Sequence, residues 1–413
     1  MEAIKKFILP NLIYCILLLT ATLQMSAIAQ ESVSGAHDAG GILQIIRPDL
    51  DKAKPVKFDY NSSDYIFKEG LCALQKNQLW GFIDTLGNWV IEPKYFIWGN
   101  KAPFFSDGIC LLGIRAADGY GNIPVYIDKK GNQLFKNQSF KEASPFYDGI
   151  AVVGKVAGPG KPTVYSFINT QGSAVSGAVA PKFKGWFFEF GPFGNGLTKI
   201  WDDKLNSYGF IDNLGKWVIK PENKQWEDAG EFSDERCAVQ NTVNFYWGFI
   251  DKTGTTRIPF DYREKPNKFS SGRALVKNSE KYKAGYLDTE GNMPLGFKYT
   301  YNSFDFYNGY ALVTLDNPQL TKAIIDVNGK IIRELLYYTD PYVNSDGTIV
   351  YQPKNQDGLQ VLNYDGKIII REAMYQSISA FSSNLAYVEF YADGSQQSGF
   401  INRKGELVIV RKD

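Results

Sequence analysis

The sequence predicts an all-β protein made of about nine tandem antiparallel β-hairpin repeats of 37–44 residues. Three observations lead to this prediction: a turn phrase that occurs nine times, a second glycine turn that precedes most copies, and flanking segments rich in aromatic and β-branched residues. Self-similarity at a period of about 40 residues is typical of repeat arrays, so it decides the fold class before any single strand is assigned.

The first turn phrase is an apolar pair, then Asp or Asn, two residues and Gly, as in the GFIDTLG that begins at Gly81. Asp at the first position of a type I turn accepts a hydrogen bond from the backbone two residues on, and Gly at the fourth position takes positive φ. We therefore predict hairpin corners, with a strand on each side such as residues 79–83 and 89–91. The nine corner residues are Asp84, Asp128, Asn169, Asp212, Asp251, Asp288, Asp326, Asn363 and Asn402.

The second motif is Phe, two residues and Gly, followed by a strand such as the AVVGK that begins at Ala151. In two copies another residue, Glu235 or Asn384, replaces the Gly, and between Asp326 and Asn363 only Asp346-Gly347 remains. Each unit therefore holds at least three strands. The clear copies begin at Phe67, Phe105, Phe146, Phe193, Phe269 and Phe306.

Adjacent apolar residues before a corner, such as Phe249 and Ile250, point to opposite sides of a strand, so both faces of that strand must be covered. Propeller-like stacking of small sheets satisfies this requirement, and an open β superhelix or solenoid is the alternative. In a closed ring an N-terminal strand completes the last sheet. Ile42–Ile46 is the best candidate for that strand, and the apolar segment Glu406–Val410 is the edge to be covered.

The N-terminus differs from the repeats. Lys5 and Lys6 precede an apolar run from Phe7 to Thr20, and an A-x-A-type site ends at Ala29. This pattern predicts a signal peptide over residues 1–29, a lead-in segment over 30–60 and a repeat domain over 61–413. We expect an extracytoplasmic location (periplasmic, secreted or cell surface) without stable membrane insertion after cleavage, because the apolar run is shorter than the about 20 residues that span a bilayer.

The repeat unit resembles the WG repeat family, also called KWG repeats, which is found in tandem in bacterial proteins. The matching residues are Leu79–Asp84 (LWGFID) and Tyr246–Asp251 (YWGFID), and the resemblance covers nearly all of the mature chain. The copies around Asn169, Asp326 and Asn363 lack the Trp-Gly pair, which puts the regularity of those units in doubt. The resemblance implies a β-repeat interaction surface and transfers no catalytic residues.

Composition and motifs disfavour most chemistry. Lys plus Arg is 45 and Asp plus Glu is 44, so no global charge draws nucleic acid. The only histidine, His37, excludes a His-dependent triad or a multi-His zinc site. The corner position recurs nine times and holds Asp in six copies and Asn in three, which favours a turn role over catalysis or calcium binding. We expect no enzyme activity, cofactor or metal. A glycosidase that uses carboxylates outside the corners is a less favoured reading; these are Glu189, Asp202, Asp203, Glu227 and Asp228.

Cys72, Cys110 and Cys237 occupy the slot two residues after the Gly position of the Phe-x-x-Gly motif, where other units hold Ala or Thr. We therefore predict buried free thiols.

Aromatic residues outside the repeat slots are the remaining candidates for a binding site. Exposed Trp side chains anchor many protein interfaces and also stack on sugar rings. The candidate ligand-binding residues are Trp98, Trp186, Trp201 and Trp226, with packing between units as the competing interpretation. The sequence thus favours a non-catalytic, secreted or surface-exposed module that binds another protein. A carbohydrate-binding module for a surface glycan is the alternative.

Overall fold

The repeats form nine separate small sheets in the computed structural model, which describes residues 45–59, 65–156, 158, 160–181, 190–222 and 225–412. All helices and strands assigned in these ranges are β-strands, which confirms the all-β prediction. The described sheets belong to one unit, Ile45–Asp413. The predicted signal peptide and the first part of the lead-in segment lie outside the described residues.

The first three sheets follow one another along the chain. Sheet 1 contains β2 (Phe67–Lys68), β3 (Leu71–Lys76), β4 (Leu79–Asp84) and β5 (Trp89–Tyr95). Sheet 2 contains β6 (Phe105–Ser106), β7 (Ile109–Arg115) and β8 (Asn122–Asp128). Sheet 3 contains β9 (Glu142–Ala143), β10 (Ile150–Val156) and β11 (Thr163–Asn169).

The middle three sheets repeat this order. Sheet 4 contains β12 (Thr198–Asp202), β13 (Ser207–Ile211) and β14 (Trp217–Ile219). Sheet 5 contains β15 (Trp226–Ala229), β16 (Cys237–Asn241), β17 (Trp247–Ile250) and β18 (Thr256–Tyr262). Sheet 6 contains β19 (Ala274–Asn278), β20 (Lys283–Leu287) and β21 (Tyr299–Thr300).

The last three sheets complete the array. Sheet 7 contains β22 (Tyr310–Thr314), β23 (Lys322–Asp326) and β24 (Ile331–Leu335). Sheet 8 contains β25 (Tyr337–Val343), β26 (Ile349–Pro353), β27 (Leu359–Leu362) and β28 (Ile368–Ala373). Sheet 9 contains β29 (Ser377–Ile378), β30 (Leu385–Ala392), β31 (Ser395–Asn402), β32 (Leu407–Lys412) and, from the N-terminal side, β1 (Lys54–Lys57).

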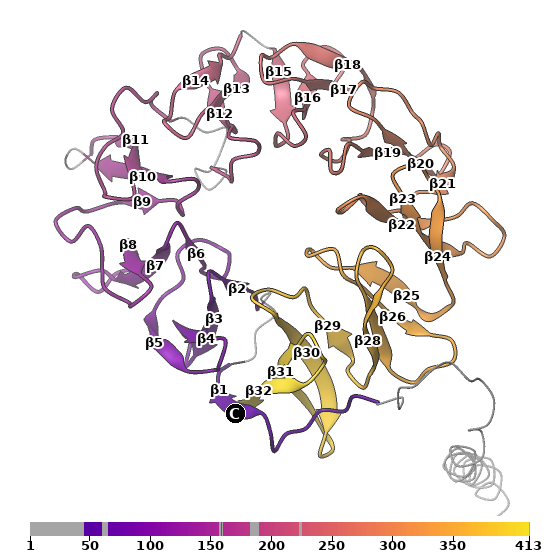
Figure 1. Cartoon of the computed structure of the whole chain (residues 1–413). Coiled ribbons are helices and arrows are strands. Elements are labelled where there is room, and N and C mark those ends of the chain that lie inside the picture. Colours follow the sequence, from indigo (N-terminus) through magenta and orange to yellow (C-terminus); the bar gives the residue numbers. More distant parts are fainter. Residues whose placement is uncertain are drawn as a thin grey trace, which may run out of the picture. The chain divides into compact units, whose positions relative to one another are not determined.

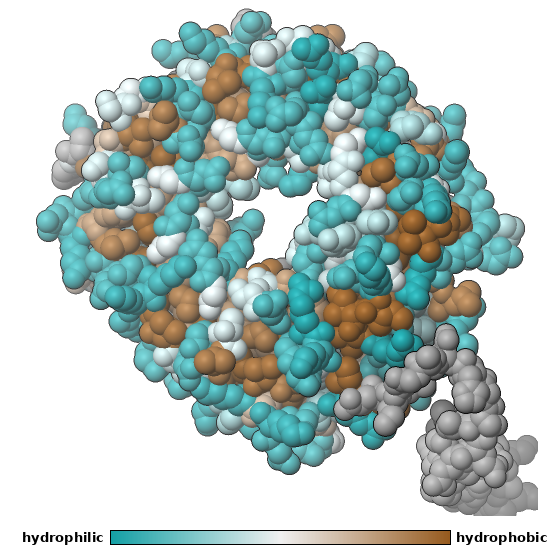
Figure 2. Space-filling view, in the orientation of Figure 1, coloured by the Kyte–Doolittle hydropathy of each residue, from teal (hydrophilic) through white to brown (hydrophobic). Residues whose placement is uncertain are grey.

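Within the described unit the nine sheets are arranged in a ring with an open centre (Figures 1 and 2). The first strand of a sheet, such as β2 or β29, lies toward the centre, and the last strand, such as β5 or β32, lies at the outer rim (Figure 1). Nine apolar clusters fill the spaces between neighbouring sheets, one for each boundary. The core is therefore distributed around the ring, and each sheet is covered on both faces, as the apolar pairs before the corners predicted.

The two sequence motifs meet at these boundaries. In most units the Phe that begins the Phe-x-x-Gly motif packs edge-on against the aromatic residue before the corner of the preceding sheet. This pairing, worth about 1 kcal/mol beyond buried area, explains why the motifs occur together. Ring centroids lie 4.8 Å apart for Phe82–Phe105, 5.0 Å for Phe210–Phe232, 4.9 Å for Phe249–Phe269 and 4.8 Å for Tyr286–Phe306.

The ring is closed by β1. This strand pairs in parallel with β32, Lys54 opposite Ile409, and buries Val56 in the cluster between sheets 9 and 1. Phe67 and Phe400 also pack across this boundary, 5.4 Å between ring centroids. The prediction of a covered C-terminal edge is confirmed, and the open superhelix is not the form observed.

The choice of Ile42–Ile46 as the closing strand was wrong. Of its two described residues, Ile46 makes an isolated parallel bridge with Ala373 of sheet 8 and packs on the neighbouring cluster. β1 reads Lys-Pro-Val-Lys, with only Val56 buried, so its sequence carries no apolar run to reveal it. Part of the predicted lead-in segment therefore belongs to the ring, whose described unit begins at Ile45 rather than at residue 61.

Both predicted turns are present. At the corner of sheet 1, Asp84 Oδ1 accepts hydrogen bonds from the backbone N–H of Leu86 (2.9 Å) and Asn88 (2.8 Å), and Gly87 has φ of 77°. The Phe-x-x-Gly motif is a two-residue hairpin turn: Lys68 pairs with Leu71, and Glu69 and Gly70 between them both have positive φ, as in a type I′ turn.

A close approach of the neighbouring strand explains why the Trp-Gly pair contains Gly. A Cβ on Gly248 would lie 2.6 Å from the carbonyl oxygen of Ile258, and one on Gly81 would lie 2.4 Å from that of Ile91. The outermost strand, β5 or β18, thus lies too close to this Gly for a side chain. Because the strands are antiparallel, the Phe-x-x-Gly turns and the Asp corners lie at one end of each sheet, here called the turn end. The hairpins between the two long central strands lie at the other, the hairpin-tip end.

The units with the poorest motif matches still form sheets. Sheets 3, 7 and 8 contain the corners of Asn169, Asp326 and Asn363. Sheet 8 lacks the Phe-x-x-Gly turn and replaces it with a second Asx corner, in which the N–H of Gly347 donates to Asn344 O and the N–H of Asn344 donates to Thr348 O. Irregular sequence there changes the turn and leaves the sheet in place.

Candidate functional site

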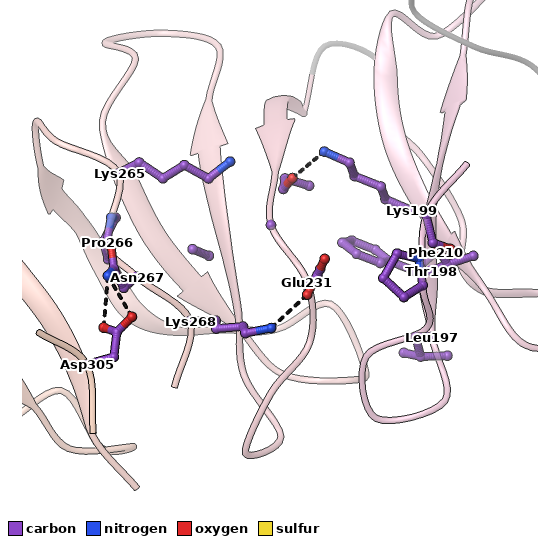
Figure 3. Close-up of a pocket in the computed structure, with 15 residues that line it drawn as sticks. Leu197, Thr198, Lys199, Phe210, Glu231, Lys265, Pro266, Asn267, Lys268 and Asp305 are labelled. Atoms are coloured by element: carbon purple, nitrogen blue, oxygen red, sulfur yellow. Dashed lines mark hydrogen bonds and ion pairs between the residues drawn. The ribbon is translucent and has the colours of Figure 1, made fainter. Parts of the chain in front are cut away.

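A groove of about 550 Å³ lies among the first segments of sheets 4, 5 and 6 (Figure 3). Its lining includes Lys199 on β12, Glu231 after β15, and Lys265 and Lys268 before β19, with Asp305 at its edge. Lys199 and Lys265 extend toward each other from opposite sides (Figure 3). Its volume is in the range of small-molecule and peptide sites, about 300–1,000 Å³.

The groove exists because two units depart from the repeat. Two positions before the motif Phe, sheets 4 and 5 have Gly191 and Gly230, both of which line the groove. Other units hold a side chain at this slot, from Ser144 and Ser379 to Phe304, whose ring lies 5.4 Å from the ammonium of Lys322. Missing side chains at two consecutive units leave the hollow.

One end of the groove is cationic. The Lys199 ammonium donates to the carbonyl oxygen of Ala229 (2.6 Å) and lies 3.4 Å from Asp228 Oδ1, while Lys265 Nζ lies 3.0 Å from Asp228 Oδ2. Burial works to raise the pKa of Asp228, but Lys199 and Lys265 outweigh it and hold that pKa below its usual value. Asp228 is thus a carboxylate shared by two lysines.

The other end carries carboxylates. Lys268 Nζ lies 3.0 Å from Glu231 Oε2, and the side-chain amide of Asn267 donates to both oxygens of Asp305, at 2.8 and 2.9 Å. Burial raises the pKa of Asp305 above its usual value, against the opposing effects of Asn267 and nearby lysines. The groove therefore presents fixed charges of both signs.

A second feature is an exposed aromatic patch at the hairpin-tip end of sheets 5 and 6. The hairpin of sheet 5 exposes Val243 (90%) and Phe245 (54%), and that of sheet 6 exposes Tyr282 (76%). Arg263 joins the two hairpins: its Nε donates to the Tyr246 hydroxyl (2.8 Å), and its Nη1 lies 2.5 Å from Glu280 Oε1. We call Val243, Phe245, Arg263, Tyr282 and Tyr301 the tip patch.

Hydrogen bonds hold the tip patch in place. The Tyr301 hydroxyl donates to Glu264 Oε2 (2.6 Å), and Glu264 Oε1 accepts the backbone N–H of Ser279 (2.7 Å). The ring of Tyr282 lies 6.3 Å from that of Tyr301, and Lys277 Nζ lies 4.5 Å above Tyr301. Exposed aromatic side chains are thus presented on hairpins whose geometry is already fixed.

Comparison with known proteins identifies the repeat. The family model for the WG containing repeat matches residues 80–95, 208–242, 247–282 and 285–317. The chain carries WG repeats. Arg263, Tyr282 and Tyr301 of the tip patch lie in matched segments, whereas Val243 and Phe245 fall between two of them. The groove residues from Phe210 to Asp305 also lie in matched segments, and those from Gly191 to Lys199 precede them.

One solved structure shares the fold of this ring. A structure described as that of the eukaryotic initiation factor is 14% identical, with a TM-score of 0.53, over 83% of this chain and 96% of that chain. Virginiamycin B lyase from Staphylococcus aureus is 13% identical over 60% of this chain and 90% of that chain, with a TM-score of 0.29. The first likeness shows a common fold only. No curated protein matches the sequence.

The four candidate tryptophans do not form one site. Trp201 and Trp226 are 6% and 2% exposed and pack in the cluster between sheets 4 and 5, so packing between WG repeats describes them and surface binding does not. Trp98 is partly buried, and its Nε1 donates to the carbonyl oxygen of Ala143 (3.1 Å) beside a small hollow of about 100 Å³. Trp186 lies outside the described residues.

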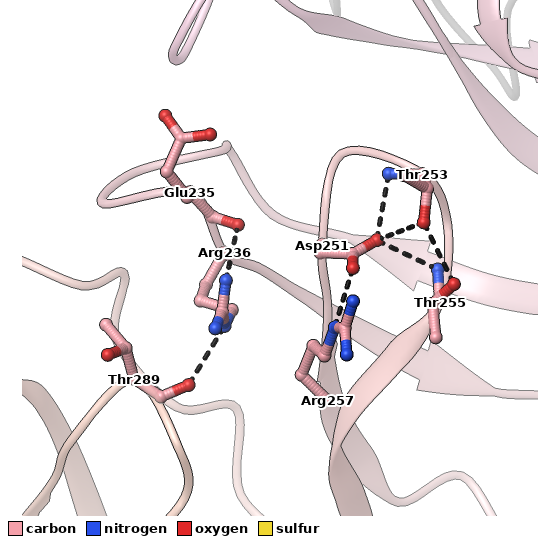
Figure 4. A network of polar contacts seen from close by, with 7 residues as sticks. All are labelled: Glu235, Arg236, Asp251, Thr253, Thr255, Arg257 and Thr289. Atoms are coloured by element: carbon pink, nitrogen blue, oxygen red, sulfur yellow. Dashed lines mark hydrogen bonds and ion pairs between the residues drawn. The ribbon is translucent and has the colours of Figure 1, made fainter.

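The corner aspartates of the WG repeats act as turn acceptors (Figure 4). Asp251 Oδ1 accepts from Thr253 N (2.8 Å) and Thr255 N (3.1 Å), and Oδ2 accepts from Arg257 Nε (2.6 Å). Burial works to raise the pKa of Asp251, but the hydrogen bonds from Thr253 and Arg257 hold it well below its usual value. Both carboxylate oxygens of Asp251 therefore accept hydrogen bonds from residues of the same hairpin.

The carboxylates considered for a glycosidase also make hydrogen bonds, ion pairs or other polar contacts, wherever the structure describes them. Asp202 Oδ1 accepts the backbone N–H groups of Lys204 and Leu205, both at 3.0 Å, in the hairpin of sheet 4. Asp228 is shared by Lys199 and Lys265. Glu189 lies outside the described residues, as does His37. No group of three or more His, Cys, Asp or Glu suited to a metal occurs among the residues that the structure describes.

The three cysteines are free and buried, as predicted, with no exposed surface at Cys72, Cys110 or Cys237. Burial raises the pKa of the Cys237 thiol to about 12. Within the described part of the chain, no helix is long and apolar enough to cross a membrane.

The groove and the tip patch were not predicted from the sequence. One signal was present: Lys199 stands at a slot that is occupied by uncharged, mostly apolar residues in the sister units, and Gly191 and Gly230 lack the side chain that the other units have two positions before the motif Phe. The tip residues carried no signal, because the hairpins between the motifs vary in length and composition and no repeat slot defines them.

Proposed function

We propose that this protein is a non-catalytic binding module that holds a partner protein against the tip patch. The observation that carries the proposal is the exposure of Val243, Phe245 and Tyr282 on two neighbouring hairpins that Arg263 fastens together. Large apolar side chains that face solvent on a pre-organised surface are typical of interaction sites.

The composition of the tip patch supports a protein as the ligand. Tyr and Arg are, together with Trp, the residues most enriched at interface positions that dominate binding energy. In the tip patch they stand beside the fully exposed apolar side chain of Val243 and the half-exposed ring of Phe245. A partner that covers these side chains removes apolar surface from water without ordering the hairpins, because Arg263 and Glu264 already order them.

Carbohydrate binding is the second candidate. Of the tryptophans predicted for it, Trp201 and Trp226 are buried, which leaves Trp98 and the exposed tyrosines to stack on a sugar. The rings of Tyr282 and Tyr301 are tilted by 56° to each other and so do not form a flat platform, which favours the protein partner.

Export is part of the same proposal. The apolar run Phe7–Thr20 and the site at Ala29 support a signal peptide and a periplasmic, secreted or cell-surface location. Fractionation of cells that express the full chain tests it. We expect the protein outside the cytoplasm with a mature N-terminus at Gln30, and cytoplasmic protein with an intact N-terminus would contradict export.

The binding experiment uses matched tyrosines. Tyr282→Ala removes a ring from the tip patch, whereas Tyr338→Ala removes a ring with the same 76% exposure from β25 of sheet 8. A partner captured from the native envelope with the full-length protein is titrated against each variant. We expect roughly tenfold weaker binding for Tyr282→Ala and no change for Tyr338→Ala.

Equal effects of the two substitutions, or none from either, would contradict the tip patch as the binding surface. A glycan array probed with the same variants addresses the second candidate. Sugar binding that is lost in Tyr282→Ala, without a protein partner, would replace the protein proposal with the carbohydrate one.

A further inference from the structure

We propose that the groove among sheets 4, 5 and 6 binds a carboxylate carried by a short peptide segment, with Lys199 and Lys265 as its cationic contacts. This site is separate from the tip patch and shares no residue with it. It adds a second recognition element, for an acidic peptide, to the binding module.

Comparison among the repeats singles out Lys199. It occupies the third position after the Gly position of the Phe-x-x-Gly motif, a slot on the central strand that packs between sheets. The eight sister residues are Ala73, Leu111, Val152, Ala238, Leu275, Leu312, Val350 and Tyr387, none of them charged. A lysine at a slot that otherwise packs apolar side chains loses hydration, and the fold itself does not require it. The neighbouring Gly191 and Gly230 open the groove at the same place.

The charges at this end are out of balance by one. Lys199 and Lys265 share the single carboxylate of Asp228, so two cations face one anion. The side chains are reachable: that of Lys199 is 28% exposed and that of Lys265 is 48% exposed. Each ammonium also lies near an aromatic face, 5.0 Å from the ring of Tyr208 and 4.6 Å from that of Trp247. A ligand carboxylate between the two lysines completes the charge balance.

The surroundings select a monoanion. Glu231 and Asp305 line the same groove, and their negative charges oppose a doubly charged phosphate group more strongly than a carboxylate. A lysine ammonium group binds a carboxylate or a phosphate as a point charge. The preference for a carboxylate over a phosphate therefore comes from the acidic neighbours Glu231 and Asp305.

The other end of the groove suits the N–H groups of a peptide. Each oxygen of Asp305 takes one hydrogen bond from Asn267, and a carboxylate has about four lone-pair sites in all. The remaining sites are available to backbone N–H donors of the ligand. A volume of about 550 Å³ accommodates an acidic side chain together with a few backbone units.

A displayed random peptide library, panned on the full-length protein and counter-selected on Lys199→Leu, tests the proposal. Leucine is the sister residue at this slot in three other units, so the variant keeps the packing of the repeat. We expect enriched peptides to contain Glu or Asp. One synthetic peptide is then compared with its Gln or Asn analogue by calorimetry.

The expected result is at least tenfold weaker binding for the neutral analogue, for Lys199→Leu and for Lys265→Met. Lys129→Leu, which removes an accessible ion-paired lysine at the turn end, serves as the control and should bind normally. Lys265→Met keeps the test decisive if Lys199→Leu does not fold. Equal binding of the neutral analogue, or displacement of the peptide by inorganic phosphate at equal concentration, would overturn the proposal. Tyr282→Ala should leave peptide binding unchanged, so this site and the tip patch fail independently.

Discussion

The two ends of the sheets differ in how closely their turns are repeated from one sheet to the next. At the turn end, all nine corners keep one length and one Asp or Asn, and neighbouring turns are hydrogen-bonded: the N–H of Gly272 donates to Asp234 Oδ2 (2.7 Å) and that of Gly149 to Asp107 Oδ2 (2.9 Å). At the hairpin-tip end, the loop has two residues between β3 and β4 but seven between β22 and β23. Repetition along the chain therefore marks the turns that the ring needs, and the variable end carries the surface that we propose binds a partner.

The largest expected effect contrasts a repeated glycine with a tip glycine. In Gly248→Ala the new Cβ would lie 2.6 Å from the backbone oxygen of Ile258, so a strand must shift, at roughly 3 kcal/mol. Gly394→Ala, at a tip with φ of 75° and nothing within 4 Å, should cost only about 1 kcal/mol. Urea unfolding measures both, and equal losses would contradict the contrast between repeated positions and the hairpin tips.

The corner of sheet 5 gives a smaller, pH-dependent effect. Asp251→Asn removes the ion pair with Arg257 and should cost about 1 kcal/mol at pH 7, whereas Asp212→Asn should cost less than about 0.5 kcal/mol, because Asn fills three sister corners.

The sign of the pH dependence follows from the low pKa of Asp251. A carboxyl with a depressed folded-state pKa stabilises the protein above its unfolded pKa of about 3.9, and this contribution is lost as pH falls through the folded value. The difference between wild type and Asp251→Asn should therefore shrink below about pH 4 in urea titrations. A difference that grows in acid would contradict the assigned role.

The smallest expected effect is at the buried thiols. Cys72, Cys110 and Cys237 have no exposed surface, and burial raises their pKa values, so a thiol reagent at pH 8 should label none of them in the folded protein. In denaturant without reductant, the mature chain should show three thiols. Finding one would reveal a disulfide.

Residue patterns predicted most of the fold because the repeated features depend on local chemistry. Asp84 and Gly87 specify a corner by themselves, and Phe67 with Gly70 specifies a hairpin turn. Ring closure was predicted only in outline. Whether Val56 or Ile46 reaches sheet 9 depends on how the chain enters the ring, a contact between residues more than 300 positions apart in sequence.

The sites were less predictable for a related reason. Trp201 and Trp226 lie outside the Trp-Gly slot, which suggested a surface role, but the same lack of a slot is compatible with filling a particular boundary between sheets. The groove arises from three substitutions in two consecutive units, Gly191, Lys199 and Gly230, which are informative only when the slots of all nine units are aligned by structure. The tip patch depends on Arg263, which contacts Tyr246 and Glu280 on two different hairpins. The spacing of residues in the sequence does not predict these contacts.

The most direct test of the account is amide hydrogen exchange with and without the captured partner. Because the hairpin-tip end is proposed to bind and the turn end to hold the ring together, the partner should slow exchange in residues 242–246 and 279–283. The corners at 84–88 and 212–216 should exchange at the same rate in both states. Protection of the corners with unchanged exchange at the tips would contradict the account and place binding at the turn end.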